Sequence, residues 1–176
     1  PSEGFTPQLL KEFTGIRWVE NGFNVAITGS CGVGKTALAC AIALNLAQQE
    51  IQVLYCRTFE LLIEIESKKE DFLARKRLMQ KLSCFKVLIL DDFGCNQKFN
   101  EEQKQILWEL ADDRYGAKPI VMCAQIRKKG FYGLLPTNDT GTESLVDRLS
   151  NPCVEIALSG KSRRAEHAEG VNLNLS

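Results

Sequence analysis

Eight residues near the start of the chain, GSCGVGKT at positions 29–36, limit the folds that this sequence can adopt. They match the pattern G-x-x-x-x-G-K-[ST], in which glycines let the backbone wrap around an anion and the lysine supplies a counter-charge. An apolar run at 23–28 precedes them, and an Ala- and Leu-rich helical pattern at 37–49 follows. A strand, this loop and a helix in that order predict a phosphate-binding loop in an α/β fold.

The rest of the chain alternates between apolar runs of strand length and longer helical patterns. Four more strands are predicted at 51–56, 85–90, 119–124 and 153–158, with helices at 6–19, 59–65, 70–82, 100–116 and 143–149 and a loop at 130–141. This alternation predicts a three-layer α/β/α core around a mainly parallel sheet of about five strands. Ligands of such sheets bind at the carboxyl ends of the strands.

Composition restricts the classes of function. The 176 residues fit one domain, and 22 basic residues balance 22 acidic ones, so any contact with nucleic acid must rest on local patches. No stretch approaches the ~18 apolar residues of a membrane helix. Among the seven cysteines the nearest pair, Cys31 and Cys40, is too far apart for a C-x-x-C site. This usage favours the reducing cytoplasm over a disulfide framework.

The predicted phosphate site includes every residue of the loop. Lys35 is expected to reach the β- and γ-phosphates of ATP, and Thr36 to give its hydroxyl to Mg²⁺. The alternative is a glycine turn that binds nothing. The full set is Gly29, Ser30, Cys31, Gly32, Val33, Gly34, Lys35 and Thr36.

Two aspartates follow the apolar run at 85–90. A carboxylate at the end of a buried strand beside the phosphate loop can hold a metal and its water shell, and we assign that role to Asp91. Asp92 is the predicted catalytic carboxylate, which polarises the attacking water. The alternative for Asp92 is a structural hydrogen bond in the turn at Phe93 and Gly94.

Six segments in order resemble the IstB family of transposition helper ATPases, a branch of the AAA+ class close to DnaC-type helicase loaders. They are ITGSCGVGKTALA, LYCRTFELL, VLILDDFG, ELADDRYG, SLVDRL and GKSRR, and the resemblance runs from about Leu9 to Arg164. It implies an AAA+ ATPase domain at 1–166 and a tail at 167–176. The family has an N-terminal region ahead of this domain, which we expect to lie outside a chain that begins at Pro1.

The resemblance also implies two sensor residues. Gln125 follows the strand at 119–124 and would hydrogen-bond the γ-phosphate or the attacking water. The chain has Cys123 and Ala124 where the family has hydroxyl residues, and a strand-ending polar residue is the alternative. Arg164 would be the second sensor, acting on the nucleotide of its own subunit, with Arg163 as the adjacent alternative.

Arg148, in the segment VDRL, resembles the arginine finger that reaches the ATP of a neighbouring subunit. Such a finger requires a homo-oligomer that assembles in the ATP state. The alternative is an exposed helix arginine that pairs with Asp147 or Glu143.

The resemblance implies a protein that binds and hydrolyses ATP with Mg²⁺, binds duplex DNA and assists a transposase. Basic clusters at 68–69, at 75–77 with Lys81, and at 127–129 suit phosphate contacts with DNA, and solvated surface charge is the alternative for each. The nearest rival function is a loader of a replicative helicase. From other classes, a P-loop small-molecule kinase and a nucleotide-binding module without turnover are the alternatives.

Overall fold

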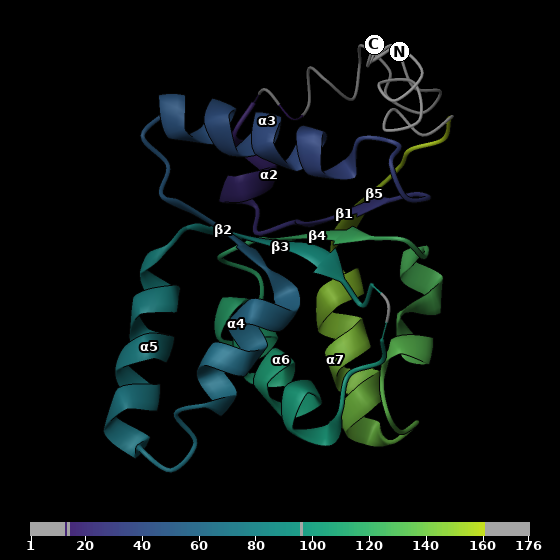
Figure 1. The fold of residues 1–176 in the computed structure, drawn as a ribbon. Helices are drawn as coiled ribbons and strands as arrows, with labels where there is room; N and C mark the ends of the chain where they lie inside the picture. Colours follow the sequence, from purple (N-terminus) through teal and green to yellow (C-terminus); the bar gives the residue numbers. More distant parts are fainter. Residues whose placement is uncertain (1–12, 14, 96, 161–176) are drawn as a thin grey trace, which may run out of the picture.

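The computed structural model describes residue 13, residues 15–95 and residues 97–160 of the chain. Its centre is a five-stranded sheet in which every pair of neighbours is parallel and the order is β2-β3-β4-β1-β5 (Figure 1). The strands are β1 (Asn24–Thr28), β2 (Val53–Arg57), β3 (Val87–Phe93), β4 (Ile120–Ala124) and β5 (Cys153–Ala157). The predicted parallel sheet of about five strands is confirmed.

Helices cover both faces of the sheet and complete three layers (Figure 1). One face carries α2 (Arg17–Glu20) and α3 (Lys35–Gln48). The other carries α4 (Thr58–Glu66), α5 (Phe72–Cys84), α6 (Glu101–Arg114), the 3₁₀ helix η1 (Lys128–Leu134) and α7 (Thr140–Ser150). Among the described residues, no helix is both long enough and apolar enough to cross a membrane.

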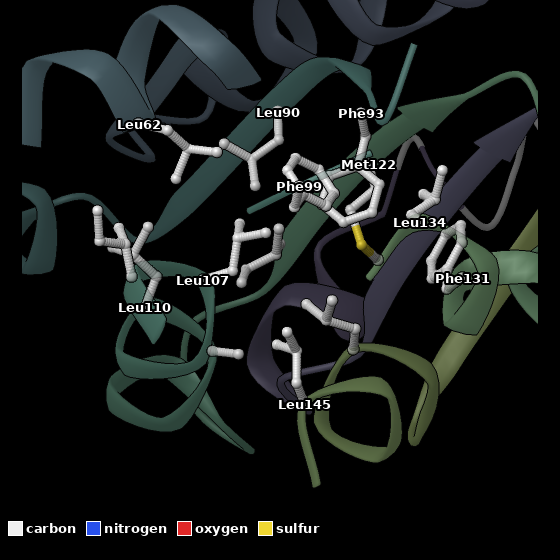
Figure 2. Packing of buried hydrophobic residues seen from close by; sticks show 14 of the residues in the cluster. Leu62, Leu90, Phe93, Phe99, Leu107, Leu110, Met122, Phe131, Leu134 and Leu145 are labelled. Carbon is white, nitrogen blue, oxygen red and sulfur yellow. The ribbon is translucent and has the colours of Figure 1, made fainter. Parts of the chain in front are cut away.

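Alternating side chains of the strands fill two separate apolar cores. On β3, Leu88 and Leu90 face the core beneath α4, α6 and α7, whereas Ile89 faces the core beneath α3. Each of these three side chains is at most 1% exposed, because the strand is covered on both faces. Figure 2 shows the core on the α6 side, where Phe93 and Phe131 complete the packing with rings 5.2 Å apart.

Several element boundaries differ from the sequence predictions. Of the predicted lead-in helix at 6–19, the structure describes residue 13 and residues 15–19, with α2 at its end. Part of the predicted loop at 130–141 is helical, since η1 continues to Leu134. The helix predicted from Glu143 begins at Thr140, because the Asp139 side chain accepts a hydrogen bond from the Thr142 amide (2.8 Å) and caps it.

Strand β3 extends three residues past its predicted end and contains a bulge. Leu90 pairs with Met122 and Phe93 pairs with Ala124. Between these two pairs the chain advances three residues in β3 and two residues in β4. The extra residue is accommodated at Asp92, whose φ of 54° is left-handed. Aspartate tolerates that conformation better than most residues. The bulge therefore changes the direction of the chain directly after Asp91.

A buried arginine connects the two loops that lead into the amino ends of β3 and β4. Arg114 closes α6 and is 2% exposed. Burial lowers the pKa of its guanidinium to about 10, so the group is charged at neutral pH. Its nitrogens donate to four backbone carbonyls, those of Leu82 (3.2 Å), Phe85 (3.0 Å), Lys86 (3.1 Å) and Pro119 (3.5 Å). One side chain thus fixes the chain where it enters both β3 and β4.

Replacing Arg114 with methionine keeps an apolar stem but leaves these carbonyls without their donor. Each unsatisfied buried group costs about 1–3 kcal/mol, so we expect Arg114→Met to lower the free energy of unfolding in urea by about 3 kcal/mol. Arg77→Met, on the exposed face of α5, is the control and should change it by less than about 0.5 kcal/mol. Equal stability of the two variants would contradict the role of Arg114.

Candidate functional site

The predicted phosphate loop lies between β1 and α3 at the carboxyl edge of the sheet. Gly34 caps α3 with a φ of 105°, and α3 begins at Lys35, two residues before its predicted start. The base of the loop is held by two backbone hydrogen bonds, from the Gly29 amide to the Ala124 carbonyl (3.2 Å) and from the Leu158 amide to the Thr28 carbonyl (2.7 Å). The loop is thus attached to the ends of both strands that flank β1.

Lys35 concentrates positive charge inside the loop. Its side chain is folded back so that Nζ donates to the carbonyls of Gly29 and Ser30, both at 2.8 Å, and the residue is only 8% exposed. Val33 is 3% exposed and anchors the loop in the core beneath α3. The ammonium and the amino end of α3 together form a site suited to phosphate oxygens.

A hydrogen bond connects this loop to β3. The Thr36 hydroxyl donates to Asp91 Oδ2 at 2.9 Å, and Asp91 is 3% exposed. Mg²⁺ prefers oxygen ligands and usually binds through one or two protein groups, substrate phosphates and water. Thr36 and Asp91 fit such an ion, whereas in the described part of the chain no three His, Cys, Asp or Glu side chains form a self-sufficient metal site.

Asp92 lies beside this pair but is exposed, because the bulge turns it out of both cores. Its amide donates to Asp91 Oδ1 at 2.9 Å and so orients the neighbouring carboxylate. The turn after β3 is closed by the carbonyl of Asp92, which accepts from the Cys95 amide at 3.1 Å. The backbone of Asp92 makes the structural contacts, and its carboxylate is available for chemistry.

The Cys95 thiol is influenced by three of the predicted site residues. Burial, followed by the negative charge of Asp92, raises its pKa, while the charge of Lys35 and hydrogen bonds with Gln125 act in the opposite direction. Lys35 and Asp92 therefore act on this buried thiol through their charges, and Gln125 acts on it through hydrogen bonds. Sequence reasoning missed Cys95, because a single cysteine in a turn carries no recognisable pattern.

Glu155 links the segment after Gln125 to the phosphate loop. Its Oε1 accepts hydrogen bonds from the Thr28 hydroxyl (3.2 Å) and from the Lys128 amide (3.1 Å). Lys128 also donates through Nζ to the Cys153 carbonyl (3.3 Å). The end of β1 and the segment after β4 are thus connected through one carboxylate in the middle of β5, which sequence reasoning also missed.

Arg148 is held by partners that the sequence did not suggest. Its Nε contacts Asp112 Oδ1 at 2.8 Å, so the ion pair is with α6 and not with Asp147 or Glu143. The guanidinium carbon lies 5.3 Å from the centre of the Trp108 ring and 5.9 Å from that of Tyr115. The Arg148 side chain is 27% exposed in this arrangement.

Arg148 does not join the site of its own chain. Its carbonyl accepts a hydrogen bond from the Asn24 side chain (2.9 Å), and Asn24 begins β1. The phosphate loop follows the other end of that strand, about 15 Å away at the usual rise per residue. The structure therefore places Arg148 and Lys35 near opposite ends of β1.

The remaining predicted residues either lie outside the described part of the chain or belong to the basic clusters. Arg164, its alternative Arg163 and the predicted tail at 167–176 lie outside the described residues. Three members of the basic clusters are in ion pairs: Lys68 with Glu64 (3.5 Å), Lys69 with Glu102 (3.6 Å) and Arg75 with Glu109 (2.7 Å). Besides Lys69, the exposed basic residues of those clusters are Lys76, Arg77, Lys81, Arg127 and Lys129.

Comparisons with known proteins identify the family to which the chain is similar. A family model for IstB-like ATP-binding proteins matches residues 2–170. The chain is 32% identical over 161 residues to a Sinorhizobium fredii protein and 31% identical over 163 residues to a Mycobacterium tuberculosis protein, both named as ATP-binding proteins of insertion sequences. Each match covers 92% of this chain and 64% of the relative, so the chain spans less than two thirds of their length.

Solved structures share the architecture at low sequence identity. The DnaC helicase loader matches with a TM-score of 0.73 and 18% identity, covering 86% of this chain and 87% of that one. Aquifex aeolicus DnaA bound to AMPPCP matches with a TM-score of 0.69 and 23% identity, covering 100% of this chain and 55% of that one. The fold is therefore that of AAA+ P-loop proteins, as the sequence resemblance implied.

Gly29 offers a test of the loop geometry. A Cβ at this position would lie 2.4 Å from the Leu158 carbonyl oxygen, so Gly29→Ala must displace the backbone that faces the phosphates. We expect the affinity for a fluorescent ATP analogue to fall at least about tenfold, which is about 1.4 kcal/mol. Gly133→Ala in η1, where a Cβ meets open space, is the matched control. Unchanged affinity in Gly29→Ala would contradict this role of the loop.

Proposed function

The chain belongs to the IstB-like ATP-binding protein family, and from that premise we propose that it hydrolyses ATP with Mg²⁺ on DNA to assist a transposase. The observation that carries the ATPase proposal is the hydrogen bond between Thr36 and Asp91. It joins the phosphate loop to an acidic strand end, the pairing that P-loop ATPases use to bind Mg²⁺ and nucleotide together.

The described residues support a division of labour in hydrolysis. Lys35 and the loop amides bind the phosphates and stabilise the charge that develops during transfer. Asp92 accepts a proton from the attacking water, and Gln125 orients that water or the γ-phosphate. When bound, Mg²⁺ neutralises phosphate charge. The charges of Lys35 and Asp92 and the hydrogen bonds of Gln125 all act on the Cys95 thiol, which supports this assignment.

Asp92→Asn separates binding from chemistry. Asparagine tolerates a positive φ as aspartate does, so the substitution removes the base and keeps the bulge. We expect steady-state hydrolysis to fall on the order of 100-fold and ATP affinity to stay within about twofold. Glu143→Gln, an exposed carboxylate in the first turn of α7, is the control. Normal turnover in Asp92→Asn would eliminate this carboxylate as the base.

Arg148 supports an assembly in which copies of the chain complete each other's sites. It lies at the edge of the sheet opposite its own phosphate loop, and its side chain is 27% exposed. Its guanidinium contacts two aromatic rings and a carboxylate. A heterologous contact between copies would bring this edge to the neighbour's nucleotide. In that contact Arg148 would stabilise the charge on the transferring phosphoryl group.

Mixing two inactive variants tests this arrangement. Lys35→Ala removes a chain's own phosphate site, and Arg148→Ala should reduce turnover on the order of 1000-fold by removing the finger. In an equal mixture, about a quarter of random heterologous contacts pair an intact Arg148 with an intact loop, so about that fraction of wild-type turnover should return. If the mixture stays as inactive as its components, Arg148 does not act between subunits.

The proposed DNA contact rests on exposed basic side chains outside the nucleotide site. Arg127 and Lys129 follow Gln125, so a phosphate backbone bound there would be coupled to the sensor segment. Lys76 and Arg77 lie together on the exposed face of α5. The chain carries no net charge, so these local groups would supply the salt-dependent attraction.

The transposase is the proposed partner because both relatives described above are named for insertion sequences. A replicative helicase is the second candidate, favoured by the match to the DnaC helicase loader over most of both chains. Retention of one purified partner and not the other in a pull-down with ATP separates these functions. The seven cysteines are odd in number, which fits a reducing compartment such as the cytoplasm better than a disulfide framework.

A further inference from the structure

Two residues where β2 passes into α4 contact Asp91, and neither has been given a role so far. The Tyr55 hydroxyl donates a hydrogen bond to Asp91 Oδ2, the same oxygen that accepts from Thr36. The Thr58 hydroxyl donates to the Asp91 backbone carbonyl at 2.7 Å, and Thr58 is fully buried. Both residues come from the segment YCRT at 55–58, where β2 passes into α4.

The strand register explains why Tyr55 reaches this carboxylate. Tyr55 pairs with Ile89, while Asp91 lies two residues further along β3 and pairs with Arg57. Residues two apart on a strand share a face and are about 6.6 Å apart, a span that an aromatic side chain covers. Ile89 and Asp91 both face the α3 side, so the tyrosine ring lies along that face and its hydroxyl meets Asp91.

Asp91 is consequently held from several directions. Oδ1 accepts from the Asp92 amide at 2.9 Å, Oδ2 accepts from Tyr55 and Thr36, and Thr58 fixes the carbonyl of the same residue. The terminal torsion of an aspartate side chain is otherwise broad, so a carboxylate with fewer donors would rotate. The Tyr55 hydroxyl is the donor in its hydrogen bond with Asp91 Oδ2.

We propose that Tyr55 is a positioning residue for magnesium, whose hydroxyl holds the Asp91 carboxylate in the orientation in which Asp91 and Thr36 together receive the ion. This inference rests on the magnesium site of the proposed function. Groups that orient a metal ligand from behind typically change metal affinity by 10–100-fold when they are removed. Tyr55 lies on β2, outside the phosphate loop, so nucleotide binding without metal should not depend on it.

The test is a binding measurement that needs no turnover. A fluorescent ATP analogue is titrated onto wild-type and Tyr55→Phe chains in EDTA, and then Mg²⁺ is titrated at a fixed nucleotide concentration. We expect Tyr55→Phe to raise the half-saturating Mg²⁺ concentration about tenfold while affinity in EDTA stays within about twofold. Tyr132→Phe, which removes an exposed phenol on η1, is the matched control and should behave as wild type.

The outcomes separate this role from the site on which it depends. Wild-type chain that binds the analogue equally with and without Mg²⁺ would overturn the magnesium site and the role of Tyr55 with it. If wild type depends on Mg²⁺ and Tyr55→Phe has the same half-saturation, only the role of Tyr55 is overturned. An equal loss of affinity with and without metal would also overturn it, because Tyr55 would then be supporting the fold and not the ion.

Discussion

The hydrogen bond between Thr36 and Asp91 is the contact on which the site depends, because it joins segments 55 residues apart in the sequence. It forms only because the parallel sheet brings the ends of β1 and β3 to the same edge, with β4 between them. Lys35 after β1, Asp92 near the end of β3 and Gln125 after β4 then all lie toward this edge. Neighbouring backbone bonds hold the loop against β4 and the chain after β5.

The bulge in β3 gives two adjacent carboxylates different environments. In a regular strand, Asp91 and Asp92 would point to opposite faces, and Asp92 would enter the core that contains Phe93. The extra residue turns Asp92 out to solvent and returns Phe93 to the core with Leu90. A buried, well-oriented carboxylate suits a metal site, and an exposed one beside it suits proton transfer. A left-handed aspartate at this point illustrates backbone strain at a functional site.

Local sequence patterns predicted the layers, the phosphate loop and the acidic pair, since each depends on neighbours within a few residues. The contacts that orient these groups were not predictable in the same way. Tyr55 meets Asp91 across 36 residues, and Arg114 meets Leu82 across 32, so both depend on the register of the folded chain. The partner of Arg148 was wrong in the sequence analysis because only its own helix was considered, whereas Asp112 comes from α6.

The most direct test of an assembling DNA-dependent ATPase is steady-state ATP hydrolysis with Mg²⁺, measured per subunit over a range of chain concentrations with and without duplex DNA. Turnover that rises with both concentration and DNA is the result that the proposed function predicts. Turnover that responds to neither, in this chain and in a full-length relative of the same family, would contradict it and indicate a self-contained nucleotide site.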